Sequence, residues 1–147
     1  MGAEKYGCSR REFLLLSAGS VVVAACGSNT TSGDPTGDAS AGNLSTLAVG
    51  STRLTGDSAS VVMRDSGGLY AMSVICTHQG CNIGTTGSVS ALGLSCSCHG
   101  SAFDPNGEVL QGPATRPLTH FAVSVDASGN ITVHRDQTVG AGQRTAV

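Results

Sequence analysis

Cysteine and histidine occur together in two short segments of this chain, and both residue types are common ligands of transition metals. In the first segment, Cys76 and His78 form a Cys-x-His pair. In the second, Cys96 and His99 form a Cys-x-x-His pair, and 17 residues separate His78 from Cys96. Two thiolates and two imidazoles make a set of four ligands. The spacing therefore predicts a metal centre held between two loops.

Each segment also contains one further cysteine, Cys81 in the first and Cys98 in the second. Their positions in the two segments look equivalent, and they are free to bond to each other. A structural zinc is an alternative, because two cysteines and two histidines suit tetrahedral zinc. Zinc fingers usually pair Cys with Cys and His with His, however, and zinc does not account for the extra pair. A scaffold made only of disulfides leaves both histidines unexplained.

The two segments, CTHQGC (76–81) and CSCHGS (96–101), resemble those of the Rieske iron–sulfur proteins. The resemblance covers about residues 45–135. It implies an all-β Rieske fold, in which a small cluster-binding subdomain, here about residues 76–115, is inserted into an antiparallel β base. The Gly-Pro-Ala sequence at 112–114 resembles the proline-containing loop that covers the cluster from a third side.

The resemblance implies that Cys76 and Cys96 bind one iron of a [2Fe–2S] cluster, and that His78 and His99 bind the other. Neutral imidazole ligands raise the reduction potential of such a cluster to about −150 to +300 mV. The free ring nitrogens are expected at a solvent-exposed tip. There they give partners a short electron path, and they couple proton uptake to electron uptake.

Further residues around the ligands are expected to tune the cluster. Gly80 and Gly100 allow backbone amides to approach it closely. Ser101 stands where high-potential members carry a serine whose hydroxyl donates a hydrogen bond to a bridging sulfide. Phe103 stands where those members carry a tyrosine donor, which predicts a potential below the top of the family range. Gln79 replaces a leucine that is usual in quinol-oxidising relatives, which weakens the case for docking at a quinone pocket.

The rest of the domain reads as short strands joined by tight turns, and no long stretch has a helical period. Glycine-containing turns separate several of the expected strands. His120 and His134 each lie in one of these strands, where a surface or half-buried position is expected. The expected strands are 59–65, 69–75, 88–95 (the weakest), 102–104, 108–110, 118–125 and 131–135.

The first 25 residues have the features of an export signal. Arg10 and Arg11 begin a twin-arginine-like motif, which directs folded proteins across the bacterial membrane. The apolar run 13–25 is shorter than the about 20 residues of a spanning helix. It ends at Cys26 in a sequence that resembles a lipobox, so we expect cleavage there and a lipid on Cys26. An ordinary signal or an uncleaved anchor is the alternative.

Composition divides the remaining chain. Residues 26–43 are small and polar, typical of a flexible tether. Residues 44–137 are expected to form the cluster domain, and 138–147 a C-terminal tail. A disulfide is expected between Cys81 and Cys98, with two free thiols as the alternative. Such a bond requires an oxidising compartment, in agreement with export. Without residues 1–25 the chain keeps five basic and eight acidic residues, so no basic patch indicates nucleic acid.

These features predict a one-electron transfer protein on the extracytoplasmic face of a bacterial membrane, related to the iron–sulfur subunit of quinol–cytochrome c oxidoreductase. A cytochrome b or c, or the large subunit of an oxidase, is the expected redox partner. No catalytic activity is expected of the chain alone. The small Rieske subunit of an exported oxidase and a zinc-stabilised lipoprotein are the alternatives. A cytoplasmic dioxygenase ferredoxin fits poorly, because that class normally lacks the additional cysteine pair.

Overall fold

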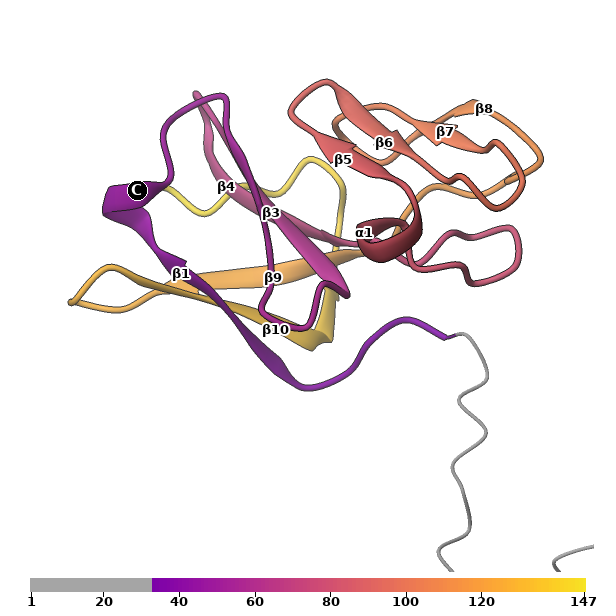
Figure 1. The fold of residues 1–147 in the computed structure, drawn as a ribbon. Coiled ribbons are helices and arrows are strands. Elements are labelled where there is room, and N and C mark those ends of the chain that lie inside the picture. Colours follow the sequence, from indigo (N-terminus) through magenta and orange to yellow (C-terminus); the bar gives the residue numbers. More distant parts are fainter. Residues whose placement is uncertain (1–32) are drawn as a thin grey trace, which may run out of the picture.

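Two antiparallel β-sheets make up the structure, a computed structural model that describes residues 33–147 (Figure 1). The large sheet has six strands, in the order β1 (Asp38–Asn43), β10 (Asn130–Val139), β9 (His120–Val125), β4 (Gly68–Ser73), β3 (Ser60–Asp65) and β2 (Thr52–Leu54). The small sheet has four, in the order β5 (Ser88–Ser90), β6 (Gly93–Ser95), β7 (Ala102–Phe103) and β8 (Val109–Gln111). The expected all-β Rieske fold, with a small subdomain inserted into a β base, is confirmed.

Two short helical turns complete the described part of the chain. One is the 3-10 helix η1 (Leu44–Thr46), and the other is α1 (Ile83–Thr86), which lies between the two sheets (Figure 1). Within residues 33–147, no helix is long and apolar enough to cross a bilayer.

The hairpin of β3 and β4 forms the centre of the large sheet. Its turn is short because Asp65 Oδ1 accepts the Gly67 amide at 2.8 Å, and Gly68 has a positive φ of 130°. All six residues of β4 are buried. Alternate side chains point to opposite faces of a strand, so Tyr70 and Met72 enter one apolar cluster while Leu69 and Ala71 enter another. Strand β4 is therefore covered on both faces.

The first of these apolar clusters joins the two sheets. It contains Met72 from the large sheet and Leu94 and Phe103 from the small one. Cys76 and Cys96 belong to the same cluster and are 3% and 2% exposed. The packing between the sheets thus places both expected sulfur ligands at the bottom of the loops that leave β4 and β6.

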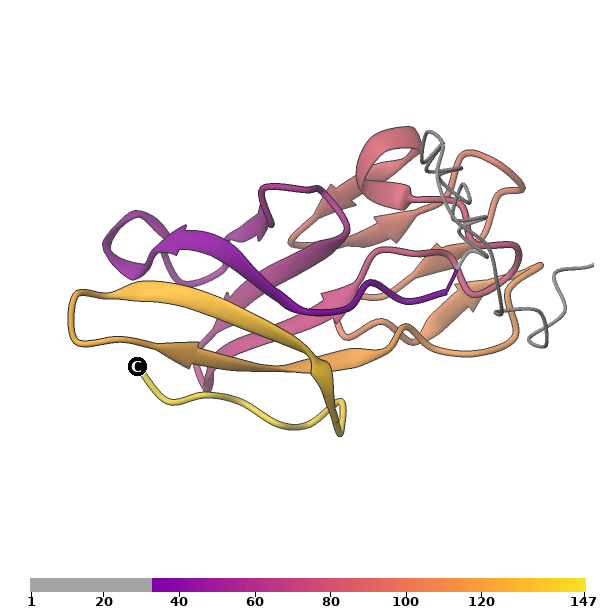
Figure 2. The same cartoon turned by 90° about the horizontal axis from the view of Figure 1, so that it is seen from below.

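The two ends of the described chain are held against the large sheet. Strand β1 pairs with β10 and lies inside 26–43, the stretch whose composition indicates a tether. The C-terminal segment, inside the expected tail 138–147, runs back along the sheet (Figure 2). Thr145 exchanges two backbone hydrogen bonds with Leu69, at 2.8 and 2.9 Å, and its hydroxyl donates to Val123 O. Both segments add strand-like pairing that composition does not reveal.

Candidate metal centre

The first cysteine loop is a compact turn closed by its own backbone. The Cys76 amide donates to Cys81 O, and the Gly80 amide donates back to Cys76 O, both at 2.8 Å. Gly80 has φ of 73°, in the left-handed region where residues with a Cβ are strained. The loop therefore requires glycine at this position.

The second loop repeats the same turn. The Cys96 amide donates to Ser101 O at 2.8 Å, and the Gly100 amide donates to Cys96 O at 3.0 Å. Gly100 has φ of 85°. Each loop is thus a six-residue turn that begins with a buried cysteine and has its glycine at the fifth position.

This equivalence corrects one expectation from the sequence. Cys81 is the sixth residue of its turn and corresponds to Ser101, whereas Cys98 is the third and corresponds to His78. The two additional cysteines therefore do not occupy matching places. The expectation was wrong because it matched the two segments by their cysteines. The register of the two turns is set instead by their backbone hydrogen bonds and by glycine.

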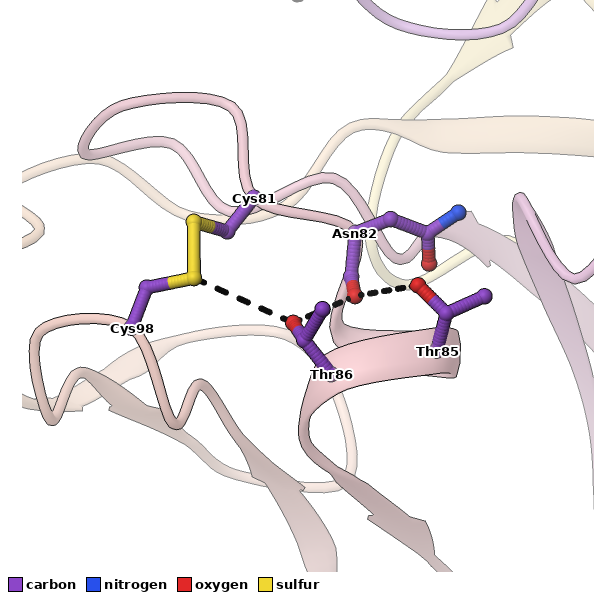
Figure 3. The surroundings of a disulfide bond; sticks show 5 residues. All are labelled: Cys81, Asn82, Thr85, Thr86 and Cys98. Carbon is purple, nitrogen blue, oxygen red and sulfur yellow. Dashed lines mark hydrogen bonds between the residues drawn. A yellow bond between two sulfur atoms is a disulfide. The ribbon is translucent and has the colours of Figure 1, made fainter.

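The pairing itself is confirmed, since Cys81 and Cys98 form a disulfide with a Cα–Cα distance of 6.6 Å. Figure 3 shows the bond beside α1, where Thr86 Oγ1 lies 3.9 Å from Cys98 Sγ and donates to Asn82 O at 2.8 Å. The sulfur of Cys96 lies within 4.8 Å of both disulfide sulfurs. Disulfide sulfurs are not thiolates, so the sulfurs of Cys81, Cys96 and Cys98 do not form a metal site. The disulfide instead lies beside the Cys96 side chain.

Sulfur and nitrogen lie on different sides of the loop pair. Cys76 and Cys96 are buried between the sheets, while His78 is half-buried and His99 is exposed. The imidazole centroids are 4.8 Å apart, and the rings meet edge to face at 80°. The arrangement can hold a metal group that has thiolates on its inner side and imidazoles on its solvent side.

The chemistry of these groups fits a bound metal cluster. Burial raises the pKa of the Cys96 thiol, and the neighbouring Cys76 raises it further, so a thiolate at this site needs a cation beside it. Within the described residues, His78 Nδ1 is buried and makes no hydrogen bond. A buried nitrogen without a partner is costly, and coordination to iron would satisfy it.

A third segment holds both loops in place. The buried Ser101 hydroxyl accepts the Ala114 amide at 2.9 Å, which leaves its own proton free to donate. On the other loop, the Thr77 hydroxyl donates to Arg116 O at 2.6 Å. The segment 112–116 therefore contacts each loop once. Sequence reasoning pointed to 112–114 as a cover, but the anchoring role of Thr77 has no signal in residue type or spacing.

Gln79 and Phe103, the two departures from the family pattern, differ in exposure. Gln79 is exposed on the first loop, whereas Phe103 is 1% exposed in the cluster of apolar residues that contains both buried cysteines. Phe103 therefore supplies packing and no hydroxyl near the ligand sulfurs.

A cleft of about 720 Å³ lies beside the first loop, between residues 75–80 and 116–120. His120 is part of its wall but is only 4% exposed, where the sequence indicated a surface or half-buried position. Its ring stacks near Tyr70 at a centroid distance of 6.5 Å, and Nδ1 lies 3.2 Å from Leu118 O. Burial lowers the pKa of His120, so the ring is a neutral part of the core.

Comparison with known sequences agrees with this geometry. The family model of the Rieske [2Fe-2S] domain matches residues 38–122. The cytochrome b6-f complex iron-sulfur subunit of Synechococcus sp. (strain WH7803) is 32% identical over 147 residues, covering 82% of this chain and 82% of that protein. The corresponding subunit of Cyanothece sp. (strain PCC 7425 / ATCC 29141) is 39% identical over 77 residues, covering 50% and 42%.

Several other curated relatives match over less than half of their own length, from 12% to 43%. Among solved structures, a chain from the complex of reduced oxygenase and oxidized ferredoxin in carbazole 1,9a-dioxygenase matches with a TM-score of 0.51 and 23% identity. That match covers 70% of this chain and 97% of the other. At this identity it shows the fold alone.

The family match spans more than half of the chain and includes both cysteine loops, and one relative is similar over most of its own length. The loops bring together two buried thiols and two imidazoles, one of which has a buried nitrogen that makes no hydrogen bond within the described residues. The chain therefore belongs to the Rieske [2Fe–2S] family of electron-transfer proteins and binds one [2Fe–2S] cluster.

Proposed function

We propose that this protein carries single electrons at the extracytoplasmic face of a bacterial membrane, to which a lipid on Cys26 attaches it. The main support for electron transfer is that the two loops bury their thiols, while their imidazoles lie nearer the solvent. Cys76 and Cys96 would bind one iron, and His78 and His99 the other. The bound cluster supplies reversible one-electron chemistry.

The residues around the loops limit how far the ligands move. The Cys81–Cys98 disulfide joins the loops directly, and segment 112–116 is hydrogen-bonded to each of them. A rigid ligand set favours fast electron transfer, because little rearrangement accompanies the change in charge. The buried cysteines exclude water from the inner side, so electrons enter and leave through the exposed His99 and its neighbour His78.

A redox protein is the proposed partner, and it would contact the histidine tip. The relatives named above are subunits of cytochrome b6-f complexes, which supports a cytochrome-containing partner for this chain. The exposed amide of Gln79 lies on the first loop at this tip. A polar residue here favours contact with a protein surface over insertion into an apolar quinone pocket.

The proposed membrane attachment depends on residues that lie outside the described part of the structure. Its support is the twin-arginine-like motif, the apolar run 13–25 and the lipobox-like sequence that ends at Cys26. The disulfide adds an independent argument, because such bonds persist in compartments outside the cytosol. A tether beyond Cys26 would keep the domain at a high effective concentration near membrane partners.

Spectroscopy of protein matured in a host with iron–sulfur assembly tests the ligand assignment. We expect the visible and electron paramagnetic resonance spectra of a Rieske cluster, and we expect Cys96→Ser and His78→Asn to abolish them. The matched control replaces the other pair, Cys81→Ser with Cys98→Ser, and should retain the spectrum in freshly prepared protein. A colourless, iron-free wild-type sample would overturn the assignment.

Cell fractionation tests the attachment separately. We expect wild-type protein in the membrane fraction and the Cys26→Ala variant in a soluble or unprocessed form. Cys8→Ala, which changes a cysteine inside the proposed signal, should behave as wild type. A wild-type membrane protein whose N-terminal peptide carries no lipid on Cys26 by mass spectrometry would exclude the lipid anchor and leave the electron-transfer proposal intact.

A further inference from the structure

A second group of reactive side chains lies on the large sheet, apart from the loops. Ser124 Oγ is 2.8 Å from His134 Nε2, and His134 Nδ1 is 2.8 Å from Asp38 Oδ1. The three residues come from β9, β10 and β1, which are adjacent strands in the sheet (Figure 1). The order of atoms, hydroxyl to imidazole to carboxylate, is that of a serine nucleophile with its base and its orienting acid.

The register of the strands explains why these side chains meet. Asp38 is directly opposite His134 in the pairing of β1 with β10, and Ser124 is directly opposite Thr132 in the pairing of β10 with β9. His134 and Thr132 are two residues apart on β10, so both point to the same face. The opposite face carries the buried Val133. The group therefore lies on the outer, polar face.

The carboxylate determines the proton positions. A carboxylate only accepts hydrogen bonds, so Asp38 requires a proton on His134 Nδ1. Nε2 of the neutral ring then carries a lone pair directed at Ser124, whose hydroxyl donates to it. This is the tautomer that a general base needs, and the strand pairing holds it in place.

The residues paired with this group on the sheet are small. Ala122 lies directly opposite His134 on β9, so the partner of His134 on that strand has only a methyl side chain. Thr132 lies directly opposite Ser124, and the Cβ atoms of such pairs are about 4.5–5.5 Å apart. A second hydroxyl-bearing residue therefore lies next to Ser124 on the same face.

We propose that Ser124, His134 and Asp38 form an acyl-transfer site for small activated esters, separate from the cluster. Ser124 Oγ bonds to the acyl carbon, and the bond between that carbon and the leaving oxygen breaks. The serine proton passes through His134 Nε2 to the leaving oxygen. Water, deprotonated by the same nitrogen, then attacks the acyl carbon. The bond from that carbon to Ser124 Oγ breaks, the proton passes from His134 Nε2 back to Ser124 Oγ, and the carboxylic acid is released.

The open position of the site defines the substrate class. Ser124 is exposed and the side chain of Asp38 is 65% exposed, so water screens the charges and the base adds less than in an enclosed site. Esters with good leaving groups, such as aryl esters, need the least assistance. The chain also suits the assay, because Lys5 is its single lysine and no lysine of the domain competes for the acyl group.

The test uses the full-length, cluster-loaded protein and p-nitrophenyl acetate, with adducts located by peptide mass spectrometry. Ser128, an exposed serine in the turn between β9 and β10, is the internal reference. We expect Ser124 to be acetylated at least about tenfold faster than Ser128, below the usual 10²–10⁴ of an enclosed general base. His134→Gln should reduce the rate at Ser124 to that at Ser128.

Asp38→Asn should lower the rate at Ser124 several-fold, and an unchanged cluster spectrum shows that each variant is folded. Equal rates at Ser124 and Ser128 in the wild-type protein overturn the proposal without any variant. Acetylation confined to His134, or a rate at Ser124 that His134→Gln leaves unchanged, also overturns it.

Discussion

The amide of Ala114 donates a hydrogen bond to the Ser101 hydroxyl at 2.9 Å, and both residues are buried. One contact therefore joins the second ligand loop to the segment that covers it. The serine oxygen accepts from the amide, and its proton remains available to a negatively charged acceptor. Ser101 thus holds the 112–116 segment, and we predict that its hydroxyl also donates toward the ligands.

Replacing Ser101 by alanine should lower the reduction potential. A hydrogen bond to a charged group contributes about 1.5 kcal/mol, and one tenfold change in a one-electron equilibrium corresponds to about 59 mV. We expect a decrease on the order of 60 mV in a redox titration. The Ala114 amide would also lose its acceptor, so the unfolding midpoint should fall.

Ser97→Ala is the matched control, because Ser97 is an exposed serine of the same loop. It should leave both potential and stability unchanged. A potential that is the same in Ser101→Ala and wild type would show that the hydroxyl only braces the segment.

Phe103 predicts a potential below the upper end of the family range, since no hydroxyl is present at this buried position. Phe103→Tyr should raise the potential by tens of millivolts if the new hydroxyl reaches a ligand sulfur. This magnitude corresponds to the net free energy of one hydrogen bond. Phe121→Tyr places the same change in the other apolar cluster. It should lower stability without moving the potential. A wild-type potential at the top of the family range would contradict the prediction.

The Cys81–Cys98 disulfide should stabilise the domain mainly through the chain entropy of the unfolded state. It joins residues 17 apart, for which the loop-closure estimate is about 3 kcal/mol. The double serine variant should therefore unfold at lower denaturant concentration and lose its cluster faster. Reductant should shift the wild type toward the variant and should leave the variant unchanged. Equal unfolding midpoints for the two proteins would rule out this role.

Asp57 should make stability depend on pH in the acid range. Burial raises the pKa of its carboxyl, but hydrogen bonds from Arg135 and Thr55 outweigh burial and lower the pKa from 3.8 to about 2. Since the folded value lies below the unfolded one, this stabilisation is complete above about pH 4 and is lost as pH falls toward 2. The carboxylate is half-exposed, so the effect is small.

Denaturant unfolding at several pH values measures this dependence. Asp57→Asn should flatten the curve between about pH 4 and pH 2. If the unfolding free energy of Asp57→Asn falls with pH as it does in wild type, carboxyls other than Asp57 cause the acid dependence.

The sequence predicted the hairpins well where turn residues bound them. Residues 59–65 and 69–75 correspond to β3 and β4, and the weak candidate 88–95 is the hairpin of β5 and β6. Glycine and proline in the turns act locally, so they can be recognised without a structure. The residue pairs of the metal loops were visible for the same reason, since their members are at most three residues apart.

Other elements could not be predicted because distant residues create them. Strand β1 has the sequence DASAGN, which lacks apolar alternation, and it forms because β10 offers it a pairing edge. The equivalence of Cys98 with His78 depends on backbone bonds that residue types do not reveal. His120 is buried because Tyr70 and Leu118 pack around it, and its alternation along the strand did not indicate this.

The location of Cys76 and Cys96 between the two sheets has a consequence for how the molecule is made. Both thiols are almost fully covered, so an iron–sulfur unit could reach them only if the closed domain opened around the two loops. We infer that loading accompanies folding. A chain loaded in this way keeps its cluster in place from the moment that it reaches its folded shape.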